Sequence, residues 1–380
     1  MDTDPCLQIA KELLEQPTAA MREQLPRRMI QKFVAARPGL SLAEDAAGNL
    51  IVRCQPAGAS AGKPPLVLVA HLDHPSFWVD GSSNGEVKLT FKGYVAEPHA
   101  QAGLRVKFFS TDSPEPIGSG ELLSVAYKNG RLDAATAKLL DGRAPEGAIA
   151  MWDFPGFSIV DGKIVTRCCD DLLGASAALS TLDAVAKLNT GAAPLWGLFT
   201  RAEEIGFLGA LEAIRHGSVP RDACVLSLEC SKAFDHAPQG GGVIVRVGDR
   251  SSIFDPQLTA ALCTSAETLA KSDASFKWQR KLMDGGSCEA TAFCAYGFRA
   301  SGVALPLGNY HNQAFRADGS KTIGPEHVVV DDYLAEVKLL TELAQHPEWL
   351  EPGAMKLPQS LLDRAQEAKV LTETHRLSLE

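Results

Sequence analysis

Nearly continuous runs of apolar residues alternate along the chain with segments whose apolar residues recur at helical spacing. The runs lie at residues 65–70, 194–200 and 224–228, with a weaker one at 302–306. Such runs are typical of strands buried on both faces of a parallel sheet. Helical patterns are found at about residues 171–188, 207–216, 256–272 and 326–346. This alternation predicts an α/β fold with a mostly parallel central sheet flanked by helices.

Two other parts of the chain follow different patterns. The N-terminal part predicts helices at about residues 5–15 and 18–36, and the last 25 residues or so predict a polar helical extension. Residues 75–166 are richer in Gly, Pro and short alternating segments, and they end in a hairpin signal at Asp161-Gly162. We expect a discontinuous α/β domain, residues 1–74 and 167–380, which would carry any active site. An all-β domain inserted at 75–166 is expected to serve oligomerisation or control of access.

Composition excludes several classes of protein. A net charge of -9 argues against a nucleic-acid partner or an anionic membrane, because both need clustered Lys and Arg. No apolar run approaches the roughly 18–20 residues of a membrane span. The acidic start has no apolar signal segment, and the nine cysteines form no CxxC pair. We therefore expect a cytoplasmic protein with reduced thiols.

Residue types that bind metals follow the predicted strands. The set comprises His71 and Asp73, then Asp170, Glu203 and Glu204, then Glu229 and finally His311. In open parallel sheets, sites form at the carboxyl ends of the strands, so these segments are expected to converge. A pair of divalent ions needs several carboxylates and imidazoles, one bridging carboxylate, and a further acid that moves a proton.

These motifs resemble the co-catalytic metallopeptidases. The pairs His71-x-Asp73, Asp170-Asp171 and Glu203-Glu204, with one acid at 229 and a late histidine at 311, are similar to those of the tetrahedral (deblocking, or glutamyl) aminopeptidase family. The resemblance extends from about residue 45 to residue 340. It also covers the inserted β domain, so it implies the zinc-exopeptidase-like fold.

The resemblance implies an aminopeptidase that hydrolyses the N-terminal residues of peptides. It implies two divalent metal ions, with zinc as the first expectation and cobalt or manganese as alternatives. It also implies dimer-based homo-oligomers, often dodecamers. The implied roles are His71 and Glu229 on the first metal, Glu204 and His311 on the second, Asp170 as the bridge, Glu203 as the general base and Asp73 as the residue that orients the His71 ring.

The chain departs from the family pattern at several positions. Glu229 stands where the family usually has Asp, and Leu172 stands where it has Arg. The family's Gly-Gly-Thr-Asp loop is Gly-Gly-Ser-Cys at residues 285–288, so substrate specificity is not carried over. His74 follows the first motif, and we interpret it as a solvated loop histidine, with contact to a substrate or a metal as the alternative.

Other interpretations stay open. Singly, Asp170-Asp171 is explained as a helix cap and Glu203-Glu204 as first-turn acids; together, in the required order, they favour a metal site. A deacylase or carboxypeptidase on the same scaffold is favoured by Glu229. A non-catalytic relative that binds metal or peptide is a third hypothesis. No His-Glu-x-x-His motif occurs, and the glycine-rich stretches lack the setting of a dinucleotide loop.

Overall fold

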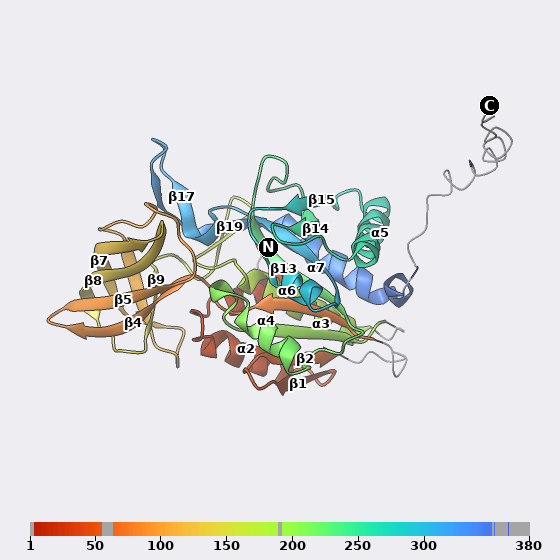
Figure 1. Ribbon diagram of the computed structural model, residues 1–380, viewed down its shortest axis with the longest axis horizontal. Coiled ribbons are helices and arrows are strands. Elements are labelled where there is room, and N and C mark those ends of the chain that lie inside the picture. Colours follow the sequence, from red (N-terminus) through yellow and green to blue (C-terminus); the bar gives the residue numbers. More distant parts are fainter. Residues whose placement is uncertain (1–3, 55–63, 189–191, 352, 354–363, 365–380) are drawn as a thin grey trace, which may run out of the picture.

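The molecule consists of an α/β part built on an eight-stranded sheet, with a closed β-barrel beside it (Figure 1). The computed structural model describes residues 4–54, 64–188 and 192–351, together with residues 353 and 364. The barrel is inserted between a central strand of the sheet and the helix that follows it in the chain. The predicted α/β fold with an inserted all-β unit is therefore confirmed. The domain limits 1–74, 75–166 and 167–380 stay a prediction.

The central sheet has the strand order β1-β2-β12-β3-β13-β16-β14-β15. The bounds are β1 Leu40–Glu44, β2 Leu50–Cys54, β3 Leu66–His71, β12 Leu195–Thr200, β13 Cys224–Lys232, β14 Val243–Asp249, β15 Trp278–Met283 and β16 Arg299–Leu307. The four strands predicted by the apolar runs, β12, β3, β13 and β16, are adjacent and parallel. Antiparallel strands join this group on both sides.

Helices cover both faces of the sheet. Their bounds are α1 Pro5–Leu14, α2 Gln24–Ala35, α3 Leu172–Lys187, α4 Leu208–Arg215, α5 Pro256–Ser272, α6 Glu289–Ala295 and α7 Val330–Gln345. The helices predicted at 171–188, 207–216 and 256–272 correspond to α3, α4 and α5. Among the described residues, none of the helices combines the length and the apolar character needed to cross a bilayer.

The packing of β3 explains its unbroken apolar sequence. Leu66, Leu68 and Ala70 belong to the core shared with α1, α3 and α7, whereas Val67 and Val69 pack with residues of α4 and α6. Successive side chains of a strand point to opposite faces, so a strand covered on both faces must be apolar throughout. This double burial holds β3 in the centre of the sheet and fixes the position of its last residue, His71.

The closed barrel has the strand order β4-β5-β8-β7-β6-β9. The bounds are β4 Ser76–Ser83, β5 Glu86–Lys92, β6 Arg105–Phe109, β7 Pro116–Lys128, β8 Arg131–Gly142 and β9 Ile149–Trp152. Its interior forms a separate hydrophobic core, in which the ring of Phe77 lies edge-on to Phe91 at 4.9 Å and to Trp152 at 5.1 Å. A core of its own allows the barrel to hold its shape beside the α/β part.

The hairpin predicted at Asp161-Gly162 forms, but outside the barrel. Both turn residues have positive φ, 50° and 73°, as a type I′ turn requires. The strands of the two small sheets are β10 Ser158–Val160, β11 Lys163–Thr166 and β19 Glu326–Val329 in one, and β17 Gln313–Phe315 and β18 Lys321–Ile323 in the other. Because β11 pairs with β19, the hairpin belongs to the α/β part by its hydrogen bonding.

Two predicted helices begin later than expected. The second helix begins at Gln24 and not at residue 18. Thr18 lies in the segment before the helix, where its hydroxyl donates a 2.5 Å hydrogen bond to the carbonyl oxygen of Leu72. The last described α-helix begins at Val330 and not at residue 326, because Glu326–Val329 is strand β19. Apolar spacing does not separate a short strand from the first turn of the helix that follows it.

Two further expectations concern the cysteines and the C-terminus. All nine cysteines are unpaired, as the sequence predicts. The predicted polar extension over the last 25 residues or so lies outside the described residues, apart from residue 364.

Candidate metal centre

The carboxyl ends of the parallel strands meet at one rim, where the predicted ligands gather. They are His71 at the end of β3, Asp170 just before α3, Glu203 and Glu204 in the short helix η1 (Glu203–Ile205), Glu229 in β13 and His311 in the short helix η2 (Tyr310–Asn312). The side chains come from segments up to about 240 positions apart in the sequence, and the parallel strand order brings them together.

Asp170 lies between two imidazoles. Its Oδ1 is 3.5 Å from Nε2 of His71, and its Oδ2 is 3.5 Å from Nε2 of His311. Glu204 places Oε1 3.3 Å from the same His311 nitrogen. One potential ligand atom each from His71, Asp170 and Glu229 lies within 4.8 Å of the others, and the same holds for Asp170, Glu204 and His311. Two groups of metal-ligand type therefore share Asp170.

The second ring nitrogen of each imidazole, Nδ1, already has a hydrogen-bond partner. Nδ1 of His71 lies 3.1 Å from the carbonyl oxygen of Asp73, and Nδ1 of His311 lies 2.8 Å from that of Tyr94. Because a carbonyl can only accept, Nδ1 carries a proton in each ring. In the neutral rings, both Nε2 lone pairs then face the carboxylates, as in metal-ligating histidines.

Buried oxygens without partners show that the residues fit divalent cations. Oδ1 of Asp170 and Oε1 of Glu204 are buried and have no hydrogen-bond partner within the described part of the chain. A buried carboxylate oxygen without a donor or cation costs several kcal/mol. Two cations, each facing oxygens and one Nε2, would satisfy these atoms, and zinc, cobalt and manganese accept such mixed ligands.

Protons compete with cations for the same space. Burial lowers the pKa of His311, but the neighbouring Glu204 and Asp170 carboxylates outweigh this effect and raise the pKa to about 10. Without a cation, the ring is therefore expected to hold a second proton between these carboxylates. Cation binding must displace that proton, which makes metal affinity fall as the pH is lowered.

The acids of the site differ in their pKa values. Burial raises the pKa of Asp170, but the neighbouring His311 and His71 imidazoles outweigh burial and hold the pKa below its ordinary value. Burial raises the pKa of Glu229 to about 8, and burial with the neighbouring carboxylates raises that of Glu203 well above its usual range. Asp170, the shared central carboxylate, is thus the strongest acid of these three residues.

Asp73 holds the turn that carries the two glutamates. Its Oδ1 accepts a 2.9 Å hydrogen bond from the Glu203 amide, and its Oδ2 accepts a 3.1 Å bond from the Glu204 amide. Oδ1 also lies 3.6 Å from Nδ1 of His71. Asp73 therefore fixes the backbone of η1, while its own carbonyl provides the closest acceptor for His71.

We expect Asp73→Ala to reduce both kcat and metal affinity about 10- to 100-fold, because residues that support metal ligands typically contribute this much. Asp73→Asn keeps one carbonyl oxygen as an acceptor, so its loss should be intermediate. Steady-state kinetics and metal titration of both variants test this expectation. Wild-type kinetics in Asp73→Ala would contradict the positioning role.

Glu326 is a residue of the site that the sequence did not reveal. It is fully buried, and its Oε2 accepts hydrogen bonds from the amides of Cys169 at 2.6 Å and Asp170 at 3.1 Å. Its Oε1 accepts from the His311 amide at 2.8 Å. One side chain thus ties the backbones of two candidate ligands together. The sequence assigned this residue to a helix, and no local motif marks it.

The interpretation of His74 as a solvated loop residue is wrong. Its ring is completely buried. Nδ1 lies 2.6 Å from the carbonyl oxygen of Asp170, and Nε2 lies 3.1 Å from Oδ1 of Asn312. Asn312 in turn donates to the carbonyl oxygens of Arg167 and Gly324. His74 therefore links the segment that carries Asp170 to the segment that carries His311.

A parallel sheet whose strand ends carry buried imidazoles and carboxylates, with a barrel inserted after its central strand, defines a protein of the zinc-exopeptidase-like class. The chain belongs to the M42 glutamyl aminopeptidase family, whose sequence profile matches residues 133–322. The chain is therefore a peptidase, a hydrolase of peptide bonds, and the family supports aminopeptidase activity. The predicted family resemblance is confirmed.

Solved structures with similar folds include aminopeptidases and peptidases from archaea. An aminopeptidase from Desulfurococcus kamchatkensis superposes with a TM-score of 0.74 at 17% identity, over 93% of this chain and 98% of that one. A TET aminopeptidase from a marine sediment Thaumarchaeota archaeon superposes with a TM-score of 0.74 at 17% sequence identity, over 92% of this chain and 99% of that one. The TET1 peptidase of Pyrococcus horikoshii superposes with a TM-score of 0.68 at 19% sequence identity, over 89% of this chain and 99% of that one. Curated protein sequences give no match.

Proposed function

We propose that this chain is a metal-dependent aminopeptidase that removes N-terminal residues from peptides. His71, Asp170 and Glu229 would hold one divalent cation, and Asp170, Glu204 and His311 would hold the other. The observation that carries the proposal is the position of the Asp170 carboxylate, whose two oxygens lie 3.5 Å from two different Nε2 atoms. A carboxylate between two imidazoles is the arrangement that a shared bridging ligand requires.

Two divalent cations held by these residues would supply Lewis acidity for polarising a scissile carbonyl and for activating water near neutral pH. The ligand set of nitrogen and oxygen atoms favours zinc as the first expectation and leaves cobalt or manganese as alternatives.

Glu203 is the proposed general base. Its Oε2 lies 3.8 Å from Nε2 of His71, and its carboxylate belongs to a potential ligand group with His71 and Glu204. The backbone hydrogen bond to Asp73 points this side chain into the centre. Glu203 would take a proton from water at a carboxylate oxygen and deliver it to the leaving amine.

Assembly into homo-oligomers is part of the proposal. The TET1 peptidase of Pyrococcus horikoshii can assemble into a tetrahedron or a large octahedral shell, and a further structure of a TET1 protein contains a dodecamer. We propose a dimer-based assembly for this chain, with the inserted domain at 75–166 contributing contacts or limiting access to short peptides. Light scattering of the purified protein tests this part, and a monomer at micromolar concentration would contradict it.

A panel of amino-acid anilides with zinc, cobalt or manganese tests the proposed reaction. Turnover of at least some unblocked anilides is expected, and it should disappear on chelation and return with added metal. A metal-loaded protein that hydrolyses none of them would remove the aminopeptidase proposal. The deacylase or carboxypeptidase alternative, favoured by Glu229, predicts instead that N-acylated substrates are preferred over unblocked ones.

A further inference from the structure

A groove with positively charged walls lies between the barrel and the turn that carries Glu203 and Glu204. The groove has a volume of about 430 Å³. Its lining comes from the end of β5, from the turn between β7 and β8, and from Ile205 of η1. Ile205 directly follows Glu204 in the chain, so the groove borders the candidate metal centre.

Three cations and one acid line the groove. Lys92 ends β5, Lys128 and Arg131 are cross-strand partners at the turn between β7 and β8, and Asp133 is the acid. Within the described residues, none of the three cations forms an ion pair; Lys92 and Arg131 contact aromatic rings instead. The whole chain carries a net charge of -9, so this unpaired positive cluster is a local exception. Such a cluster attracts a negatively charged ligand group.

Backbone hydrogen bonds fix the position of the groove relative to the second ligand group of the centre. The amide of Leu132 donates to the carbonyl of Val95 at 2.9 Å. The preceding residue, Tyr94, has its carbonyl oxygen 2.8 Å from Nδ1 of His311. The turn with the two cross-strand cations is therefore tied to the segment that holds the His311 ring.

Arg131 lies within reach of a short peptide bound at the centre. Its guanidinium carbon is 5.0 Å from the centre of the Tyr94 ring, and that ring is 6.4 Å from the ring of His311. These two contacts together limit the separation of the guanidinium and the imidazole. An extended peptide advances about 3.3–3.6 Å per residue, so two or three residues span that separation. Stacking on Tyr94 leaves the in-plane N–H donors of the guanidinium free for a carboxylate.

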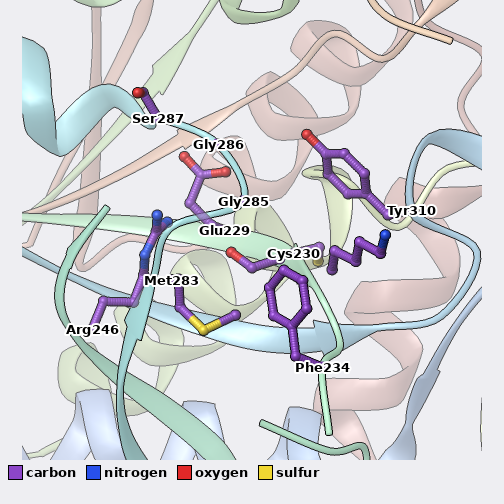
Figure 2. A pocket seen from close by; sticks show the side chains of 11 residues that line it. Glu229, Cys230, Phe234, Arg246, Met283, Gly285, Gly286, Ser287 and Tyr310 are labelled. Atoms are coloured by element: carbon purple, nitrogen blue, oxygen red, sulfur yellow. The ribbon is translucent and has the colours of Figure 1, made fainter. Parts of the chain in front are cut away.

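The cavity at Glu229 offers no comparable room for a peptide. Figure 2 shows this cavity, which Glu229 and Tyr310 border, and its volume is about 60 Å³. Glu229 belongs to the ligand group of His71, whereas Glu204, next to the groove, belongs to the other group. A cavity of this size is too small for several residues of a peptide. The groove is the wider opening, so the part of the substrate after the scissile bond is expected to lie there.

We propose that Arg131, together with Lys128, binds the C-terminal α-carboxylate of short peptides, so that the groove selects substrates with two or three residues after the scissile bond. This inference rests on the proposed function and identifies its substrate class. The N-terminal residue lies at the metal centre, and the carboxylate at the other end of the peptide accepts hydrogen bonds from the guanidinium. The contact is remote from the reacting carbonyl, so it stabilises substrate and transition state equally and acts on KM.

The test compares the tripeptide Leu-Ala-Ala with its C-terminal amide by kcat/KM. The wild type is expected to prefer the free acid by about 5- to 20-fold, the range of a partly exposed charge-assisted pair, and mainly through KM. The preference should fall at high salt. Arg131→Met should bring the acid-to-amide ratio close to one, and Arg131→Glu should reverse it. The ratio compares two substrates on one variant, so a general loss of activity through Tyr94 leaves it unchanged.

Arg105→Met is the matched control. Arg105 is an exposed arginine of the same barrel, on β6, and it does not line the groove. Its acid-to-amide ratio should equal that of the wild type. Lys128→Met should lower the ratio less than Arg131→Met does, and this variant keeps the inference testable if the Arg131 variants do not fold.

Peptide length and the source of the carboxylate are tested separately. Amidation of an eight-residue peptide should have no effect, because its C-terminus extends beyond the groove. An effect as large as on the tripeptide would indicate general charge attraction and overturn the inference. Amidated Leu-Ala-Asp carries its carboxylate on a side chain instead. If it matches free Leu-Ala-Ala and responds to Arg131→Met, the assignment to the C-terminal carboxylate is wrong.

Two outcomes separate this inference from the proposed function. If the wild type hydrolyses Leu-Ala-Ala and its amide equally well, the groove does not bind the carboxylate, and the aminopeptidase proposal stays intact. If the metal-loaded protein hydrolyses neither of these peptides nor the Leu anilide, the proposed function itself fails.

Discussion

Glu203→Gln is expected to lower kcat about 10²- to 10⁴-fold, the contribution of a general base, while the protein still binds two cations. Glutamine has nearly the same shape as glutamate and leaves the backbone amide of residue 203 free to donate to Asp73, so the turn η1 should persist. It has no site that accepts and returns a proton at neutral pH. Single-turnover kinetics and metal analysis of the same preparation measure the two effects separately.

Glu212→Gln is the control for this variant. Glu212 lies on α4, is partly exposed, and pairs with Arg215 and His216. The same chemical change there should leave both kcat and metal content at the wild-type values. Equal activity of the Glu203→Gln and Glu212→Gln variants would contradict the assigned role of Glu203. Loss of bound metal from Glu203→Gln would show that this residue is a ligand and not the base.

The central strands and the residues at their ends could be predicted because one physical constraint governs both. A strand segment buried on two faces is largely apolar, so β3 and the first half of β13 stand out in the sequence. A charged or polar ligand-type residue directly after such an apolar segment indicates a functional site. This reasoning selected His71 and Glu229, and the fold places their side chains in one group.

Elements at the edges of the sheet could not be predicted in the same way. β15 is an edge strand in which most side chains are partly exposed, so it has no continuous apolar run. α6 is only seven residues long and gives no helical repeat. β14 carries Arg246 within its otherwise apolar sequence, and this charged residue interrupts the run.

Residues that support the ligands could not be recognised in the sequence for a different reason. Glu326 binds the amides of residues that precede it by 15, 156 and 157 positions. Its partners are backbone groups, which leave no residue-type signature at the other end of the contact. His74 likewise binds the carbonyl of Asp170, so its burial could not be inferred from the residues around it. Such long-range contacts to the backbone appear only in the folded chain.

Asp170→Asn is expected to abolish binding of both cations and to reduce activity about 10³-fold or more, since Lewis-acid activation contributes several kcal/mol. The substitution removes the negative charge shared by the two ligand groups and replaces one oxygen by an amide nitrogen. The loss of bound metal and of activity should exceed that of any variant that affects only one of the two ligand groups. Metal content by elemental analysis and kcat on an unblocked anilide measure the two consequences.

Single-group variants give the decisive comparison. Glu229→Ala should lose the cation held with His71, and His311→Ala should lose the one held with Glu204, so each should retain one equivalent. Asp171→Asn is the matched control for Asp170→Asn. Burial raises the pKa of Asp171 well above its usual value, which favours the uncharged form that an amide resembles, and Asp171 belongs to neither ligand group. The control should therefore keep both cations. If Asp170→Asn also retains two equivalents of metal, Asp170 does not bridge, and the two groups are independent sites.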